Sequence, residues 1–107
     1  MNLAEITTRM HAIRDHNDWR QFHSPKNLAM AASVEMAELV EIFQWLTEAQ
    51  SRQLPAEQLA HAGQEIGDVV LYLVLLCGEL GLDMEQVVRA KLADNEKRFL
   101  PGSKGNV

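Results

Sequence analysis

The sequence is short of the residue types on which many small catalytic sites depend. Its 107 residues include one cysteine, Cys77, so no disulfide framework can form within the chain. The four histidines show neither an H-x-x-x-H nor an E-x-x-H spacing, which disfavours a zinc site or a ferritin-type di-iron bundle. There is no glycine-rich phosphate loop, and no serine or cysteine has the local signature of a nucleophile.

Positive charge and long apolar runs are also scarce. The net charge of −5 argues against a protein that binds the backbone of a nucleic-acid polymer, because such proteins need a basic face. The apolar run at residues 69–77 is far shorter than the roughly 20 residues that cross a bilayer, and the N-terminus does not resemble a signal peptide. We therefore expect a cytoplasmic protein that binds neither a membrane nor a nucleic-acid polymer.

The spacing of apolar residues predicts an all-α fold, a four-helix bundle. A single domain is expected over residues 1–99, followed by a disordered tail at residues 100–107. The expected helices lie at about 2–17, 25–49, 55–80 and 83–99. The second and third of these are apolar nearly all round, and four short helices cannot bury both of them. We therefore expect a homo-oligomer whose interface covers the excess apolar surface.

Two carboxylate pairs stand out in the apolar second and third helices: Glu35 with Glu38, and Glu65 with Asp68. The members of each pair are three residues apart, so they share one face of a helix. An unpaired carboxylate is costly to bury, whereas a hard divalent cation takes oxygen ligands and offsets that cost. The pattern predicts that these four carboxylates hold Mg²⁺, with Mn²⁺ as a substitute. The alternative is that both pairs lie on solvated helix faces.

Other side chains extend this pattern. Trp45 and Tyr72 lie on the same helical stripes as the two acidic pairs, where they either stack on a nucleobase or belong to the core. Lys91, Asn95 and Arg98 share a stripe of the last helix. They either bind phosphate and sugar or form a solvated helix end whose cations suit the dipole.

Taken together, these segments resemble a known family. The MazG-like all-α nucleotide pyrophosphohydrolases have an E-x-x-E and E-x-x-D signature, which this sequence resembles in E-M-A-E-L-V-E followed by E-I-G-D. The resemblance is closer to the dCTP pyrophosphatase branch, through W-R-Q-F-H-S-P-K-N-L, F-Q-W, D-V-V-L-Y-L-V and K-L-A-D-N-E-K-R-F. The chain departs from that branch at Ala37, where glycine is usual, at Gly67, where serine is usual, and in a short loop between Trp45 and Pro55.

The resemblance implies a Mg²⁺-dependent cleavage of a (deoxy)nucleoside triphosphate, dCTP among the candidates, into the monophosphate and pyrophosphate. It implies that the four carboxylates bind the metal, and that substrate-contact positions match His11, Trp19, Trp45, Tyr72, Lys91, Asn95 and Arg98. It also implies dimers or dimers of dimers with sites at subunit interfaces, and a role in clearing surplus or noncanonical nucleotides. Our hypothesis for the catalytic base is Glu35 or Glu38, with Glu41 either orienting a ligand or solvated.

Two other functions are compatible with the same sequence. The first is a non-catalytic helical interaction module that a metal ion stabilises. The second is a related phosphohydrolase that releases orthophosphate or acts on a dinucleotide or a diphosphate. Mg²⁺-dependent release of pyrophosphate distinguishes the expected function from the module, and the identity of the released product, pyrophosphate or orthophosphate, distinguishes it from the related phosphohydrolase.

Overall fold

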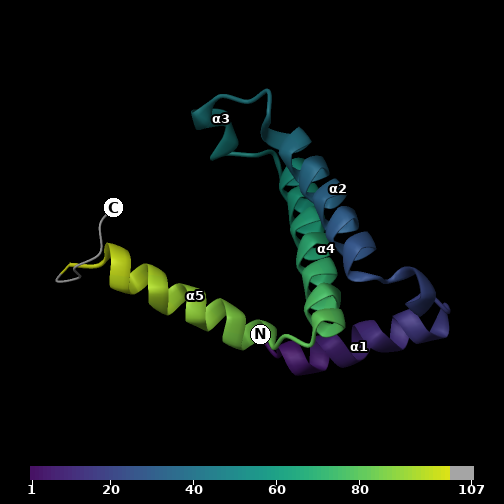
Figure 1. Ribbon diagram of the computed structural model, residues 1–107. Helices are drawn as coiled ribbons and strands as arrows, with labels where there is room; N and C mark the ends of the chain where they lie inside the picture. The colour runs from purple at the N-terminus through teal and green to yellow at the C-terminus, as the bar shows by residue number, and fades with distance from the viewer. Residues whose placement is uncertain (102–107) are drawn as a thin grey trace.

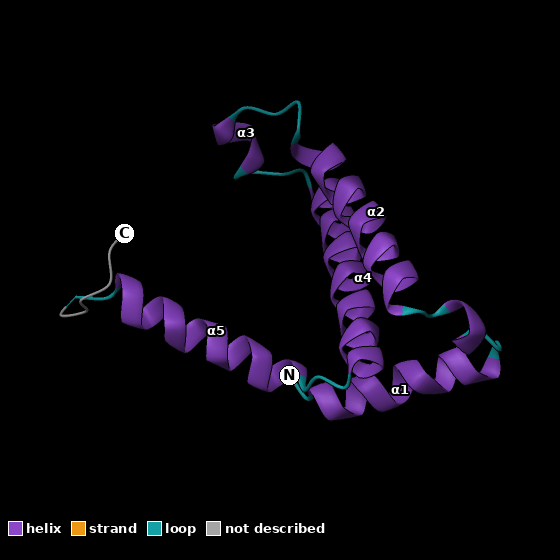
Figure 2. Ribbon diagram, viewed as in Figure 1, coloured by secondary structure: helices purple, strands orange, loops and turns teal. Residues whose placement is uncertain are grey.

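A computed structural model describes residues 1–101, and this part of the chain folds into helices joined by short loops (Figure 2). The elements are α1 (Leu3–His16), a 3₁₀ turn η1 (Arg20–Phe22), α2 (Pro25–Phe43), α3 (Glu48–Ser51), α4 (Ala56–Leu80) and α5 (Met84–Phe99). No strand occurs among the described residues, which confirms the all-α prediction. The predicted tail lies, from residue 102 onward, outside the described residues.

The centre of the fold is an antiparallel pair formed by α2 and α4 (Figure 1). Both helices begin and end where local signals dictate. Ser24 caps α2 by accepting a hydrogen bond of 3.1 Å from the backbone N–H of Asn27, and Pro25 occupies the first turn. Gly81 ends α4 in the left-handed conformation, with φ of 68°, as the sequence predicts. The buried apolar side chains are few: Leu28, Ala32, Ala62, Val74 and Leu75.

The prediction of one helix over residues 25–49 is wrong at its C-terminal end. The helix stops at Phe43, and a separate short helix, α3, begins after Thr47. Thr47 and Gln50 form a reciprocal capping box, with hydrogen bonds of 3.1 Å and 2.9 Å between each side chain and the other residue's backbone N–H. This box satisfies backbone groups that would otherwise be unpaired at a helix start, and so stabilises a new N-terminus there.

The expected four-helix bundle, which was predicted to assemble as a homo-oligomer, is not completed within a single chain. The part of the chain that the structure describes has five α-helices: α1 crosses the C-terminal end of α4, while α5 extends away from the α2–α4 pair and has no buried residue (Figure 1). The radius of gyration is 17.1 Å, against about 13 Å for a typical domain of this length. The accessible surface is 8261 Å², against about 6,000 Å² for a folded monomer of this mass. The chain therefore leaves apolar surface uncovered.

One helix of the described chain, α4, is long and apolar enough to cross a membrane by length and composition alone. Core helices of soluble proteins meet the same criteria, and α4 here packs along α2. It also carries the carboxylates of Glu65 and Asp68 near its middle. The expectations of a cytoplasmic protein and of no membrane partner stay predictions.

The Ser24 cap holds the start of the helix that carries Glu35 and Glu38. We expect Ser24→Ala to lower the free energy of unfolding by about 1 kcal/mol, because an N-terminal backbone N–H loses its acceptor. Urea denaturation followed by circular dichroism measures this change. Ser33→Ala, on the exposed face of the same helix, is the matched control and should change stability by less than about 0.5 kcal/mol. Equal denaturation midpoints for the two variants would contradict the assigned cap.

Candidate metal centre and adjoining cavity

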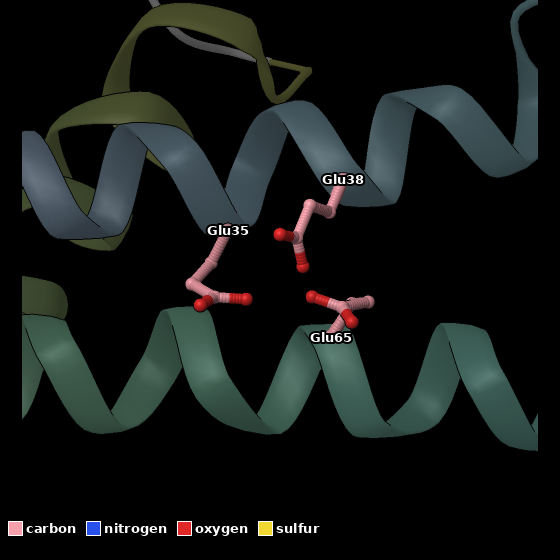
Figure 3. A group of neighbouring side chains, drawn as sticks. All are labelled: Glu35, Glu38 and Glu65. Atoms are coloured by element: carbon pink, nitrogen blue, oxygen red, sulfur yellow. The ribbon is translucent and has the colours of Figure 1, made fainter.

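Three carboxylates from two helices meet where α2 and α4 run side by side (Figure 3). Glu35 and Glu38 come from α2 and Glu65 from α4, and one ligand oxygen from each lies within 4.8 Å of the others. A hard divalent ion with oxygen ligands at about 2.0–2.6 Å allows ligand oxygens to be about 4–5 Å apart. The three oxygens are therefore close enough to share one ion.

Small buried residues allow this approach. Ala32 lies one turn before Glu35 on α2, and Ala62 lies one turn before Glu65 on α4. Both alanines are buried, and side chains this small let two packed helices approach each other closely. The carboxylates extend across the contact from either side (Figure 3).

The electrostatics of the group call for a cation. Glu65 is 7 % exposed, and its Oε2 is buried with no hydrogen-bond partner among the described residues. Its Oε1 lies 3.3 Å from His61 Nε2. The adjacent Glu65 carboxyl, with which Glu35 can share a proton, raises the pKa of Glu35, and burial and the charge of Asp68 add to that effect. An unpaired buried oxygen beside carboxylates that repel one another fits a hard divalent ion.

Asp68, the fourth predicted ligand, does not belong to this group of three. It is exposed and lines a neighbouring cavity, which it shares with Glu35. Its charge reaches Glu35, since it contributes to the raised pKa of that residue. The structure thus brings three of the four predicted ligands together and leaves the fourth at the edge of the cavity.

The cavity next to the three carboxylates has a volume of about 390 Å³, within the usual range of small-molecule sites. Segments from α1 to α4 contribute its lining: Met10, Arg14, Trp19, His23, Glu35, Asp68, Leu71, Tyr72 and Leu75. Two of the predicted substrate-contact residues, Trp19 and Tyr72, therefore meet in one cavity beside two carboxylates. Aromatic faces next to a metal centre suit a ligand that has a flat ring and an anionic group.

Sequence reasoning did not assign five residues of this cavity to the site: Met10, Arg14, His23, Leu71 and Leu75. Of these residues, Arg14 could most readily have been predicted. It lies four residues after Met10 on the apolar stripe of α1, a position that is usually buried in the core. Because arginine is charged, Arg14 was assumed to belong to the exposed face of an amphipathic helix.

The other predicted contact residues lie elsewhere in this chain. His11 faces α4, where a Cβ added to Gly78 would lie 3.3 Å from its Nε2, and it is not among the residues that line the cavity. Trp45 follows the end of α2 and is 87 % exposed. Lys91, Asn95 and Arg98 are exposed on α5, the helix that extends away from the α2–α4 pair (Figure 1). A single chain therefore does not bring these residues to the metal centre, and their substrate contacts stay predictions.

Comparison with known proteins agrees with the fold and with the acidic motif. A sequence profile of the MazG-like family matches residues 30–105. The chain belongs to the MazG-like family. This MazG-like protein is 38 % identical over 98 residues to dCTP pyrophosphatase 1 of Mus musculus. It is 37 % identical over 99 residues to dCTP pyrophosphatase 1 of Homo sapiens. The family resemblance of the sequence is thereby confirmed.

The chain spans 58 % of the length of these relatives, and the alignments cover 89 % of the chain itself. A crystal structure of a pyrophosphatase from Archaeoglobus fulgidus is similar over 94 % of both chains, with a TM-score of 0.85 and 32 % sequence identity. The arrangement of helices is therefore shared with a solved protein over nearly its whole length.

The raised pKa of Glu35 sets the direction of one pH dependence. Between its ordinary value of 4.5 and its raised value, the folded protein binds more protons than the unfolded chain. The free energy of unfolding of the metal-free protein therefore falls as the pH rises through that interval. We expect Glu35→Gln to remove this decline and so to raise the metal-free Tm above that of the wild type on the high-pH side of the interval. Thermal unfolding across a pH series measures both effects.

The same variant tests the metal. Mg²⁺ at about 100 times its Kd should raise the wild-type Tm by on the order of 10 °C and that of Glu35→Gln by much less. Glu96→Gln on α5 makes the same change of charge far from the carboxylates, and should behave as the wild type. If Mg²⁺ stabilises Glu35→Gln and the wild type equally, the three carboxylates do not form the metal centre.

Proposed function

We propose that this protein is a nucleoside triphosphate pyrophosphohydrolase. It would cleave a (deoxy)nucleoside triphosphate, dCTP among the candidates, to the monophosphate and pyrophosphate, and so remove surplus or noncanonical nucleotides. The observation that carries the proposal is the group of three carboxylates beside a cavity lined by Trp19 and Tyr72. Relatives named dCTP pyrophosphatase 1 and a structural neighbour named a pyrophosphatase support it.

The proposed roles follow from position. Glu35, Glu38 and Glu65 would hold the divalent ion, which we propose is Mg²⁺, with Mn²⁺ as a substitute. When bound, such an ion neutralises phosphate charge and lowers the pKa of a bound water. Asp68 lies at the cavity edge next to this group and would complete the ligand set.

The cavity would bind the substrate in one orientation, because its two ends differ in chemistry. Glu35 belongs both to the carboxylate group and to the cavity wall, so its carboxylate can accept a proton from a water that attacks at this junction. Glu38 is the alternative base. The phosphates would then lie at the carboxylate end, and the nucleobase would stack on Trp19 and Tyr72 further along the cavity.

We infer that the active form is a homodimer or a homotetramer. The apolar side chains of α5 have no cover in their own chain: Val87, Val88, Leu92 and Phe99 are all exposed. The accessible surface exceeds that of a typical monomer of this mass by about 2,000 Å², the size of a stable interface. In such an assembly, α5 of a second copy would supply Lys91, Asn95 and Arg98 to the site, and Trp45 would be covered.

The proposed reaction has a direct test. With Mg²⁺ present, we expect the wild type to release pyrophosphate, and not orthophosphate, from dCTP or another triphosphate in a substrate panel. Glu38→Gln should lower kcat by about 100-fold or more, because a metal ligand or the base is lost. Glu96→Gln should keep full activity, and chelation of the metal should abolish it.

A different product, or none, would indicate one of the two alternative functions. Release of orthophosphate would identify a related phosphohydrolase. No release of phosphate from any nucleotide, with a Mg²⁺-dependent rise in Tm retained, would identify the non-catalytic module.

The assembly is tested by molar mass in solution. We expect light scattering at micromolar concentration to give two or four times the mass of one chain, and Leu92→Glu on the apolar stripe of α5 to lower that mass. Ala90→Glu adds the same charge on the opposite side of the helix and serves as the control, with no expected loss of mass. A monomeric wild type would contradict the inference.

A further inference from the structure

Arg14 is the feature of the cavity that the proposed reaction does not use. It is 8 % exposed, lies in the last turn of α1 and lines the cavity. Its Nε donates a hydrogen bond of 2.9 Å to Asp15 Oδ1, and its Nη1 lies 3.6 Å from Glu79 Oε1. A buried arginine is costly unless its charge is paired and its donors are used.

The two acidic partners decide what Arg14 can bind. Asp15 and Glu79 together offset the positive charge of the guanidinium, and the bond from Arg14 lowers the pKa of the Asp15 carboxyl. A guanidinium whose charge is already balanced is poorly suited to attract a phosphate. It keeps N–H donors, however: Asp15 accepts from Nε only, and Nη1 faces Glu79 at 3.6 Å, beyond hydrogen-bond distance and with one of its two N–H groups, so the other N–H of Nη1 and those of Nη2 remain for a ligand. Such donors suit a neutral acceptor.

The position of Arg14 points to the same kind of partner. Asp68 and Leu75 both line the cavity, and they are about 10 Å apart along α4. Arg14 contacts Glu79, which lies one turn beyond Leu75. The guanidinium therefore lies at the end of the cavity away from the carboxylates, where a bound nucleotide would place its base and not its phosphates.

Aromatic and polar groups accompany Arg14. Trp19 and His23 line the same cavity, with their ring centroids 6.3 Å apart, and the backbone N–H of Trp19 donates a hydrogen bond of 2.9 Å to the backbone oxygen of Arg14. His23 Nδ1 is buried and has no hydrogen-bond partner in the described part of the chain. Flat walls together with unused hydrogen-bonding groups are what a nucleobase edge requires.

We propose, on the basis of the proposed function, that Arg14 determines base specificity by donating two hydrogen bonds, from Nη1 and Nη2, to two adjacent acceptors on the nucleobase edge. Cytosine presents such a pair in O2 and N3. Uracil has the same size but carries a hydrogen on N3, which would face a guanidinium N–H. Arg14 therefore selects cytosine over uracil among rings of equal size.

Two variants separate this role from a structural one. Arg14→Lys keeps a positive charge near Glu79 but loses the planar pair of donors. Glu79→Gln removes the ion pair between α1 and α4 but keeps the guanidinium. Arg9→Lys is the matched control, since Arg9 lies on the same helix with its side chain 76 % exposed.

The readout is KM and kcat for pyrophosphate release from dCTP and from dUTP. Loss of one bidentate contact is expected to raise the KM of Arg14→Lys for dCTP about tenfold or more, with the KM for dUTP nearly unchanged. Glu79→Gln should lower Tm yet keep the wild-type ratio of the two KM values, and Arg9→Lys should match the wild type. If Arg14→Lys changes both KM values equally, or neither, Arg14 does not read the base.

Binding to the wild type provides a test that needs neither turnover nor a folded variant. Titration calorimetry should show dCMP binding about tenfold or more tightly than dUMP. Equal affinities, or no binding of either, would overturn the proposal for Arg14. Failure of the proposed function is a different result, namely selective dCMP binding by a protein that releases no pyrophosphate.

Discussion

The repulsion among Glu35, Glu38 and Glu65 is the constraint around which the rest of the structure is arranged. Three carboxylates lie within 4.8 Å of one another, and one of them is buried with an unpaired oxygen. Within the described residues, the only basic group that pairs with them is His61. The fold therefore carries an electrostatic cost at the centre of its α2–α4 pair, which a hard divalent ion would offset. Stability and metal binding are thus linked in one set of side chains.

The helices around this centre are sufficient to hold the carboxylates but not to enclose them. Close packing at Ala32 and Ala62 fixes the two backbones, whereas the core beyond them consists of few side chains. The cavity beside the carboxylates combines an acidic end with an aromatic wall and the buried guanidinium of Arg14. The two ends of the cavity differ in charge. The carboxylates at one end need a cation, whereas the guanidinium of Arg14 at the other end is neutralised by its acidic partners and still offers N–H donors. A ligand that is anionic at one end and flat and polar at the other matches this distribution.

Much of this arrangement follows from local sequence signals. The starts of α2 and α5, the end of α4 and the spacing of the acidic pairs depend on contacts within one or two turns, so Ser24, Asp83 and Gly81 predict them. The break after Phe43 escaped prediction because the apolar pattern continues past it while the capping box of Thr47 starts a new helix. The burial of Arg14 was not predicted because it depends on contact with α4, which is far away in the sequence. The exposure of α5 was not predicted because the periodicity of apolar residues shows that a helix has an apolar face but does not show what covers that face.

The exposed surfaces of the chain match one another in size and character. The α2–α4 pair leaves Val34, Val40 and Ile66 exposed, while α5 leaves Val88 and Leu92 exposed. Helix α5 is about 24 Å long and α2 about 28 Å long, so one copy's α5 could lie along most of another copy's pair. A bundle closed in this way would bury apolar surface from both partners, and it would bring basic residues of α5 toward a centre rich in carboxylates. The same contact would then supply both the missing core and the missing positive charge, and would account for the incompleteness of both in a single chain.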